Sequence, residues 1–503
     1  MSTTELDFDS CYRAVAARDA RFDGRFYTAV TTTRIYCRPV CPARTPTSRN
    51  VRFYRHAASA EAAGFRPCKR CRPELSPGDP GWDHRGDLVG RALRLIDEGA
   101  ADDGGITRLA GRLHITERHL HRLFAAELGV GPLAVVRTKR LLLAKQLLTE
   151  TGLPISDVAF AAGFGSVRQF NATMKETYGF TPGELRATAG RAASGNALTL
   201  RLHRREPYEA GALMRFLAAR AIPGLERADE TSYSRAVPQG TITLTPLPDH
   251  VRLDVTLDDT RHLARVVARA RRLLDLDADP AAISGALGAT ALAPLVAARP
   301  GLRVPGAWDG FEAAVRAVIG QQISVAGART ILGRLTARAG RTAGGEFGGE
   351  FGGAGGTAGA GGTAGGGAGE ANGTGAGGTD GGGPNLLFPT AADLAEADLA
   401  GLGLTGRRVT TLRALAAKVA DGEIDLDGAQ EPAEAVARLL EVPGIGPWTA
   451  GYIALRALRD PDAWPRGDLG LRRAMVSLGI PEDHIERWRP WRAYAALHLW
   501  SSE

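Results

Sequence analysis

The chain has 503 residues, enough for two to four domains of ordinary size. Its 62 Lys and Arg outnumber its 55 Asp and Glu, and the formal net charge of +7 favours a polyanionic partner. No apolar run is long enough to span a membrane, and the first residues lack the basic and apolar regions of a signal peptide. We therefore expect a cytoplasmic protein with no membrane partner, whose five reduced cysteines favour a metal site over disulfides.

The first segment, to about Trp82, contains four clustered cysteines. They form two close pairs with 26 residues between them: Cys37 with Cys41, and Cys68 with Cys71. Four thiolates in such pairs can close a tetrahedron around Zn²⁺, and an all-cysteine shell usually marks a structural site. The spacing alone therefore predicts a structural zinc site. Cys11 belongs to neither pair and is most simply a small buried apolar residue.

The residues around these cysteines, 26–41 and 64–71, resemble the N-terminal domain of Ada, the regulator of the adaptive response to alkylation. The resemblance covers about residues 8–75. It implies that Cys37 accepts a methyl group from a methylphosphotriester in the DNA backbone, and that Cys41, Cys68 and Cys71 complete the zinc shell. Zinc keeps the sulfur as a thiolate, which is the nucleophilic form.

Two helix-turn-helix units are predicted between Ile106 and Arg186. Thr116 is the expected N-cap of one second helix, and Ser166 with Gln169 has the capping-box spacing at the other. Side chains that turn outward on these two helices suit phosphates and base edges in the major groove: Arg118, His119, Arg122, Arg168, Gln169 and Asn171. The alternative is a small helical spacer with a solvated polar face.

This segment resembles an AraC-type DNA-binding domain, down to the closing residues 178–184, and Ada proteins carry the same module in the same place. The resemblance implies a transcription regulator that binds promoter DNA, is associated with the nucleoid and has RNA polymerase as a partner. Many Ada-type regulators end in a methyltransferase domain with a Pro-Cys-His-Arg motif that repairs O6-methylguanine. That motif is absent, so that activity is not expected.

The pattern changes after a short linker at 192–196. Alternation of apolar and polar residues at 198–202 and 251–255 predicts half-buried antiparallel strands. Helical periodicity resumes near Leu263 and dominates to the end. It is interrupted by a tract of mostly Gly, Ala and Thr, 342–384, which cannot bury a core and is predicted to be a flexible, disordered surface loop.

A Pro-Gly-x-Gly turn lies at 443–446, directly before a predicted helix. Backbone N–H groups at such a turn can bind a phosphate without any side chain, and the glycines allow close approach. An ordinary helix cap is the alternative for the turn alone. Asp468 follows Gly446 by 22 positions.

The turn and Asp468 resemble the helix-hairpin-helix and catalytic Asp of the AlkA-type 3-methyladenine DNA glycosylases, and the similarity runs from about Ala197 to the end. It implies that Asp468 stabilises an oxocarbenium-like transition state as the N-glycosidic bond of an alkylated base is hydrolysed. A flipped base would stack on Trp448, Tyr452 and Trp500, although each of these alone also suits core packing. The DNA contacts that the resemblance implies are Gln321, Gln322, Gly444, Gly446 and Thr449.

Two positions depart from the family patterns. Gln322 stands where AlkA has a Leu wedge, and a Gln can also fill the space that a flipped base leaves. Trp448 stands where strand-cleaving glycosylases carry a Lys, which predicts a monofunctional enzyme without a Schiff base. Asp460 and Asp462 do not match the catalytic Asp and are expected in a loop.

We therefore expect a monomeric, multidomain α+β protein that binds alkylated double-stranded DNA and promoter DNA. The predicted domains are a small zinc domain (1–82), an all-α double helix-turn-helix domain (83–191) and a glycosylase (197–503). The glycosylase divides into an antiparallel β subdomain (197–285) and a helix-hairpin-helix bundle (286–503). The rival hypothesis is a transcription regulator whose glycosylase-like half is an inactive DNA-binding remnant.

Overall fold

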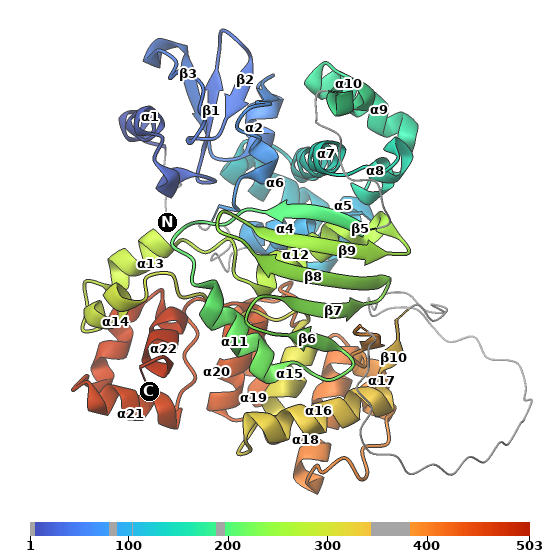
Figure 1. Ribbon diagram of the computed structural model, residues 1–503, viewed down its shortest axis with the longest axis vertical. Coiled ribbons are helices and arrows are strands. Elements are labelled where there is room, and N and C mark those ends of the chain that lie inside the picture. The colour runs from blue at the N-terminus through green and yellow to red at the C-terminus, as the bar shows by residue number, and fades with distance from the viewer. Residues whose placement is uncertain (1–5, 80–87, 103, 188–196, 344–382, 503) are drawn as a thin grey trace, which may run out of the picture.

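The structure, a computed structural model, describes residues 6–79, 88–102, 104–187, 197–343 and 383–502. The predicted linker at 192–196, the boundaries at 82 and 191 and most of the Gly-rich tract lie outside these ranges. Within the ranges, no helix is both long and apolar enough to cross a bilayer. The fold is the expected multidomain α+β arrangement (Figure 1).

The first domain is built on a four-stranded sheet with the order β3-β1-β2-β4. β2 and β4 run parallel, with Tyr36 opposite Pro67, so Cys37 at the end of β2 lies beside Cys68 directly after β4. Cys11 is 5% exposed and packs in a small apolar cluster, as predicted. The elements are α1 (Phe8–Ala17), η1 (Ala20–Phe22), β1 (Tyr27–Val30), β2 (Ile35–Cys37), η2 (Ser48–Asn50), β3 (Val51–Tyr54), α2 (Ala57–Ala62), β4 (Arg66–Pro67) and η3 (Pro73–Leu75).

The next domain is helical and contains both predicted helix-turn-helix units. Thr116 Oγ1 accepts a hydrogen bond from His119 N at 3.3 Å, and Ser166 Oγ accepts one from Gln169 N at 3.1 Å, so both expected N-caps are confirmed. The long helix α7 joins the two units. The elements are α4 (Leu88–Asp97), α5 (Gly105–Arg112), α6 (Glu117–Leu128), α7 (Pro132–Glu150), α8 (Ile155–Ala161), α9 (Val167–Tyr178) and α10 (Pro182–Ala187).

A five-stranded antiparallel sheet begins the second half of the chain, in the order β5-β9-β8-β7-β6. The alternating segments at 198–202 and 251–255 form its paired strands β5 and β9, with Leu200 opposite Leu253. One face of the sheet packs on helices through Leu200, Leu253 and Val255, which are fully buried. The elements are β5 (Ala197–Leu202), α11 (Ala210–Arg220), β6 (Glu226–Ala228), β7 (Tyr233–Val237), β8 (Gly240–Pro246), β9 (Val251–Leu257), η4 (Thr260–His262) and α12 (Leu263–Leu273).

The remaining chain is mostly helical and has two apolar cores. One lies around α15 and α18, and the other joins α13 and α14 to the C-terminal helices α21 and α22. The elements are α13 (Pro280–Leu287), α14 (Ala293–Ala298), α15 (Gly310–Ile319), α16 (Val325–Ala339), β10 (Arg341–Thr342), β11 (Leu386–Leu387), α17 (Ala391–Glu396), α18 (Gly406–Ala420), α19 (Pro432–Leu440), α20 (Pro447–Ile453), η5 (Ala454–Leu458), α21 (Leu469–Ser477), η6 (Glu482–Trp488) and α22 (Arg492–Trp500).

Two predicted boundaries in this half differ from the structure. The predicted boundary at 285 falls inside α13, whose side chains belong to the core of the C-terminal helices. The Gly-rich tract was predicted to begin at Thr342. Thr342 instead lies in β10, where it pairs with Leu386 of β11. This short antiparallel ladder holds β10 and β11 side by side.

The described residues before position 188 and those from position 197 onward form two halves that pack against each other (Figure 1). The core of the second helix-turn-helix unit is continuous with the core under β5–β9. The buried Arg205, just after β5, donates to the carbonyl oxygens of Asp23 (2.6 Å) and Gly78 (2.7 Å) in the first domain, and to that of Asp277 (2.9 Å). Arg272 forms a nearly buried ion pair with Glu98. The described parts of the two halves therefore share one interior.

Candidate functional sites

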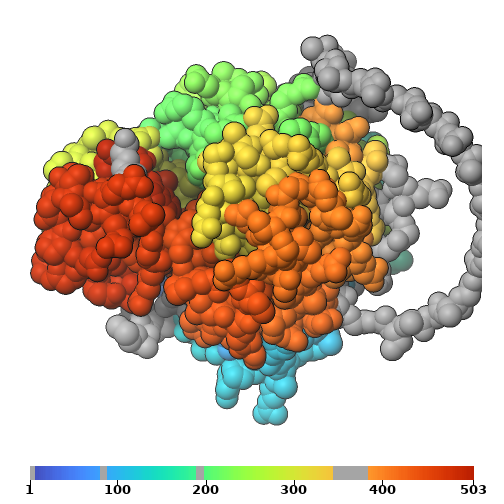
Figure 2. All heavy atoms as spheres, turned by 90° about the horizontal axis from the view of Figure 1, so that it is seen from below, coloured from blue at the N-terminus to red at the C-terminus, as the bar shows by residue number. Residues whose placement is uncertain are grey.

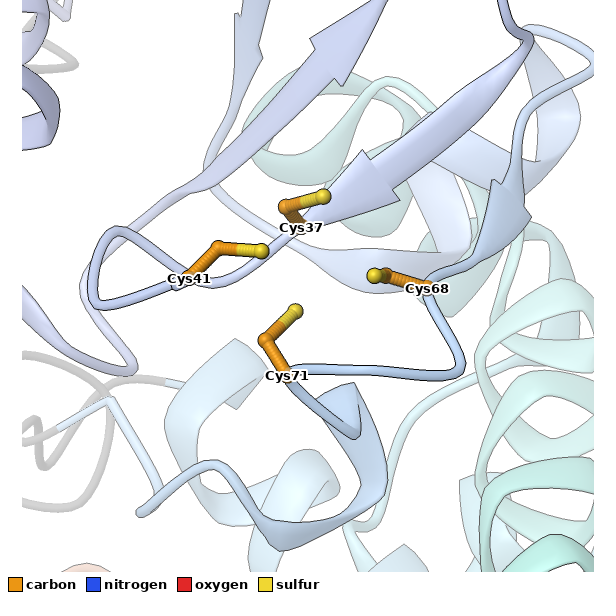
Figure 3. Close-up of side chains that lie close together, drawn as sticks. All are labelled: Cys37, Cys41, Cys68 and Cys71. Carbon is orange, nitrogen blue, oxygen red and sulfur yellow. The ribbon is translucent and has the colours of Figure 1, made fainter. Parts of the chain in front are cut away.

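The four clustered cysteines meet at the end of the first sheet, at the last residue of β2 and in the loops that follow β2 and β4. Their Sγ atoms all lie within 4.8 Å of one another and point toward a common centre (Figure 3). Zn–S bonds of about 2.3 Å in a tetrahedron would hold the sulfurs about 3.8 Å apart, so this donor set fits Zn²⁺. The predicted ligands are thus all brought together.

The four sulfurs differ in their surroundings. Cys68 and Cys71 are buried, and each accepts a backbone N–H, from Arg70 at 3.4 Å and from Arg38 at 3.3 Å. Cys37 and Cys41 are only half-buried. Burial blocks the approach of an outside group to the sulfurs of Cys68 and Cys71. The half-buried pair is therefore better placed to react with a group outside the protein.

The basic residues beside the cysteines have separate contacts. The Arg38 guanidinium is ion-paired with the buried carboxylate of Asp23, with Nε 2.9 Å from Oδ1. The Lys69 ammonium lies 4.4 Å from the ring centroid of Phe180, which follows α9. Arg70 is exposed. The charge of Arg38 is thus largely balanced within the first domain, and the second helix-turn-helix unit touches the cysteine loop.

The second helices of the two helix-turn-helix units, α6 and α9, present the polar face that the sequence predicted. Leu120 and Phe124 of α6, and Phe170 and Met174 of α9, are completely buried. The opposite face carries the predicted DNA-binding side chains. His119 is half-buried, and the other five are exposed: Arg118, Arg122, Arg168, Gln169 and Asn171. Seen from below, the segment near residue 110 projects at the rim of the glycosylase-like half (Figure 2).

The Pro-Gly-x-Gly turn joins α19 to α20, and its two glycines are required for different reasons. Gly444 has φ +89°, and a Cβ there would lie 2.2 Å from Thr411 Oγ1, so the fold itself requires glycine. Gly446, the N-cap of α20, has φ −99°, and a Cβ there would meet nothing within 4 Å. The described fold therefore does not require glycine at 446. The space beside its Cα is open, and an outside group can approach the backbone closely there.

The loop after α15 is fastened to this turn. The Gln321 side-chain amide donates to Gly444 O at 3.2 Å and to Thr449 Oγ1 at 2.8 Å, and Thr449 is buried. The side chains of Gln321 and Thr449, both predicted DNA contacts, are therefore engaged in positioning the loop. Gln322 is exposed and has φ +56°, a left-handed conformation that a glutamine rarely adopts.

A cavity of about 720 Å³ is lined by α11, α15, α16, α20, η5 and α22 and by the segment 302–308. It brings together the predicted catalytic carboxylate and all three predicted aromatic residues: Asp468, Trp448, Tyr452 and Trp500. The Trp448 and Tyr452 rings are stacked, with centroids 5.5 Å apart and planes 12° from parallel. Asp460 and Asp462 lie in the loop after η5 and outside the cavity lining, as expected.

Asp468 is held by three donors. Its Oδ2 accepts the Trp448 indole N–H at 2.7 Å, and its Oδ1 accepts the Trp500 indole N–H at 3.0 Å. Oδ1 also caps α21 by accepting Leu471 N at 2.9 Å. Two of the predicted base-stacking residues therefore also fix the orientation of the carboxylate, a role that their positions in the sequence do not indicate.

Three further residues of the cavity wall were given no role from the sequence: Phe216, Arg220 and Arg456. Arg456 lies on η5, where the helix of α20 widens into a π-helical turn. Such turns are rare and frequently occur at functional sites. A π-turn leaves no periodicity that sequence analysis could detect, and so Arg456 was missed.

Comparison with known protein families agrees with this division of the chain. A model described as the metal binding domain of Ada matches residues 10–74, and one described as a helix-turn-helix domain matches residues 109–188. A third, the AlkA N-terminal domain, matches residues 199–309.

Three relatives illustrate the similarity. A Mycobacterium tuberculosis H37Rv protein named "Probable bifunctional transcriptional activator/DNA repair enzyme AlkA" is 45% identical, over 99% of this chain and 96% of its own. The Escherichia coli K12 "DNA-3-methyladenine glycosylase 2" is 32% identical, over 59% of this chain and 95% of its own. The Escherichia coli K12 "Bifunctional transcriptional activator/DNA repair enzyme Ada" is 37% identical, over 36% of this chain and 50% of its own.

Proposed function

The chain belongs to the family of bifunctional proteins that join an Ada-type zinc-binding transcriptional activator to an AlkA-type DNA glycosylase, and from this premise we propose its two activities. The C-terminal half is a monofunctional glycosylase that removes 3-methyladenine and related alkylated bases from double-stranded DNA. The N-terminal half is a methyl-dependent regulator of promoters. The observation that carries the first proposal is the position of Asp468 in an aromatic cavity beside a helix-hairpin-helix turn.

The chemistry of the cavity follows from Asp468. Positive charge develops on the deoxyribose as the glycosidic bond breaks, and a fixed carboxylate beside C1′ stabilises it. Both Asp468 oxygens already accept indole N–H groups, so they are held in position before the substrate arrives. The stacked Trp448 and Tyr452 rings offer a face to the flipped base.

DNA is held at the hairpin by backbone groups. Among the described residues, the N–H groups of Gly446, Trp448 and Thr449 take part in no hydrogen bond, and the open space at Gly446 admits a phosphate. Gln322, exposed and held in a strained conformation by the fastened Gln321, is the proposed wedge. No lysine lines the described cavity, which supports hydrolysis without a Schiff base.

Cys37 is the proposed methyl acceptor of the N-terminal half. Its half-exposed sulfur attacks the methyl carbon of a methylphosphotriester, and the electron pair of the broken C–O bond stays on the phosphate oxygen. Zinc bound by the four cysteines would keep the sulfurs as thiolates. Methylation of one thiolate would change the formal charge of the four cysteines with bound Zn²⁺ from −2 to −1. Within a Debye length of about 8 Å, this weakens its repulsion of the DNA backbone.

Promoter DNA is the proposed ligand of α6 and α9, through Arg118, Arg122, Arg168, Gln169 and Asn171. RNA polymerase is the proposed partner at the promoter, and the protein is proposed to act as a monomer associated with the nucleoid. The intact set of Asp468, Trp448 and the hairpin glycines argues against the rival hypothesis of an inactive glycosylase-like remnant.

The glycosylase is tested by incubating the purified full-length protein with methylated DNA and measuring the release of 3-methyladenine. Asp468→Asn preserves the shape of the side chain but removes its charge, and we expect release to fall about 10²–10³-fold while DNA binding persists. Asp462→Asn, outside the cavity, is the matched control. Near-normal release by Asp468→Asn would refute the assignment. The abasic product should stay intact until alkali is added.

The regulator is tested with Cys37→Ser and DNA that carries methylphosphotriesters. We expect this variant to take up no methyl group and to show no rise in promoter affinity, yet to release alkylated bases normally. Cys11→Ala, which removes a cysteine outside the cluster, should behave as wild type. Equal promoter affinity of wild-type protein before and after methylation, at low and moderate salt, would rule the switch out.

A further inference from the structure

One edge of the five-stranded sheet is covered by a helix of the N-terminal half. β5 is the outer strand beside β9, so its outward-facing backbone groups meet no further strand of the described sheet. At Arg201 they are bound instead by two side chains of α7. Glu150 Oε2 accepts Arg201 N at 3.2 Å, and Gln146 Nε2 donates to Arg201 O at 3.1 Å and to Glu150 Oε2 at 2.9 Å. α7 therefore closes this edge of the glycosylase sheet.

The same helix holds the loop that carries the second cysteine pair. Arg72, the residue after Cys71, donates from Nη2 to Glu150 Oε1 at 2.9 Å, and the Glu150 side chain is only 8% exposed. One turn earlier on α7, the buried Lys145 ammonium donates to Cys68 O at 3.2 Å. The Glu150 carboxylate thus joins the cysteine loop to the sheet edge, with one oxygen bound from each side.

The first cysteine pair has a separate tie to the same stretch of chain. Arg38, the residue after Cys37, is ion-paired with Asp23 and donates from Nη1 to Cys71 O at 3.2 Å. The backbone oxygen of Asp23 in turn accepts Arg205 Nη2 at 2.6 Å. Arg205 lies between β5 and α11, and α11 forms part of the wall of the base cavity. Each cysteine loop is therefore connected, through one acidic residue, to β5 or to the segment that follows it.

The metal determines how firmly these two ties are held. Four sulfurs within 4.8 Å of one another are cross-linked when Zn²⁺ bonds them, and binding of a structural metal contributes folding free energy. Without this cross-link, the loops that carry Arg38 and Arg72 are held less firmly. A largely buried carboxylate such as that of Glu150 is destabilised when its cation moves away. Metal binding therefore favours the docked sheet edge, and the docked edge favours metal binding by the same factor.

We propose that metal occupancy of the cysteine cluster and the stability of the glycosylase half are linked through these two ties. The zinc site then has a second role besides holding the methyl acceptor. It strengthens the fold of an enzyme whose described cavity wall includes none of the four cysteines. The linkage requires only zinc binding and folding, and so it does not depend on the base release proposed above.

Thermal unfolding of the full-length protein tests the linkage, followed by tryptophan fluorescence with zinc bound and after chelation. Six of the seven tryptophans lie at position 308 or later, so the signal reports on the glycosylase half. For the wild type, we expect chelation to lower the melting temperature by about 3–5 °C, which corresponds to a coupling factor of about ten. Zinc affinity is measured separately, by competition with a chromophoric chelator under reducing conditions.

Two variants weaken the ties from opposite sides. Glu150→Gln keeps the size of the side chain but removes its charge, and Arg205→Met removes donors on the glycosylase side without touching a cysteine. We expect each variant to bind zinc on the order of 3- to 10-fold more weakly than wild type and to lose less melting temperature on chelation. Glu176→Gln breaks an exposed ion pair with Arg137 in the helix-turn-helix domain. It is the matched control and should behave as wild type in both measurements.

An unchanged melting temperature of the wild type after chelation would overturn the proposal. Wild-type zinc affinity in both Glu150→Gln and Arg205→Met would overturn it as well, as would a loss of melting temperature on chelation equal to that of Glu176→Gln. The effect of zinc is compared within each variant, so a general loss of stability does not imitate the expected result. If Glu150→Gln does not fold, Arg72→Met removes the same contact from a side chain that is 28% exposed.

Discussion

Asp468 illustrates how single residues set the chemistry of this molecule. The sequence identifies this carboxylate through its resemblance to a catalytic position. The same resemblance identifies Trp448 and Trp500 as aromatic residues of the base cavity. The direction of the two indole N–H groups depends on how α20 and α22 pack around the start of α21. That packing is tertiary, and so the second role of the tryptophans could not be read from the sequence.

We predict that Trp500→Phe lowers the rate of base release about tenfold, because the ring remains but Oδ1 of Asp468 loses a donor that fixes its orientation. The affinity for substrate DNA should change little. Single-turnover rates at saturating protein, together with binding measured separately, distinguish the two effects. Trp464→Phe is a suitable control, since Trp464 pairs with Trp488 away from the cavity. Unaltered release by Trp500→Phe would show that orientation by this indole is unimportant.

At the scale of elements, the hairpin between α19 and α20 contains one glycine that the fold requires, Gly444, and one that we propose for DNA binding, Gly446. We predict that Gly444→Ala destabilises the protein by about 1–3 kcal/mol, because φ is +89° and the new Cβ would clash with Thr411. Gly446→Ala should leave the free energy of unfolding nearly unchanged but weaken binding to DNA about tenfold, since the methyl group blocks approach to the backbone.

Urea unfolding and binding to a duplex that contains an abasic analogue measure the two quantities for both variants. Full DNA affinity in Gly446→Ala would mean that no phosphate approaches this turn closely. The paired variants also control for each other, since they introduce the same methyl group two positions apart.

Element by element, local signals in the sequence were reliable. Alternation predicted β5 and β9, apolar periodicity and capping residues predicted α6 and α9, and cysteine spacing predicted the cluster. The predicted boundary at 285 falls inside α13, and Asp279 before Pro280 is a helix-start signal in the sequence that marks where this helix begins. Arg220 and Arg456 were missed because their importance arises only where α11 and η5 face one cavity.

At the scale of the whole molecule, the two halves are joined by buried polar contacts as well as by a shared apolar core. Burial lowers the pKa of Arg205 to about 10, and three carbonyl oxygens from both halves accept its N–H groups. Docking of this kind depends on surfaces far apart in the sequence. Local patterns therefore indicated the separate domains but gave no information on how they are assembled.

We predict that Arg205→Met lowers the free energy of unfolding of the full-length chain by about 1–3 kcal/mol, because buried carbonyl oxygens lose their donor. Urea unfolding monitored by tryptophan fluorescence measures this loss. Arg252→Met, on the exposed side of β9, is the comparison and should be close to neutral. A stability equal to that of wild type for Arg205→Met would indicate that the two halves are joined only loosely.

The shared interior also bears on how many molecules a cell needs. A zinc domain and a glycosylase that fold as separate proteins can be present in different amounts, and each can be occupied without affecting the other. Here, one buried arginine and one continuous core bind the regulator to the enzyme. Each copy held at a promoter is a copy withdrawn from the search for damaged bases elsewhere on the chromosome. The number of molecules available for repair and the number available for regulation are therefore the same number.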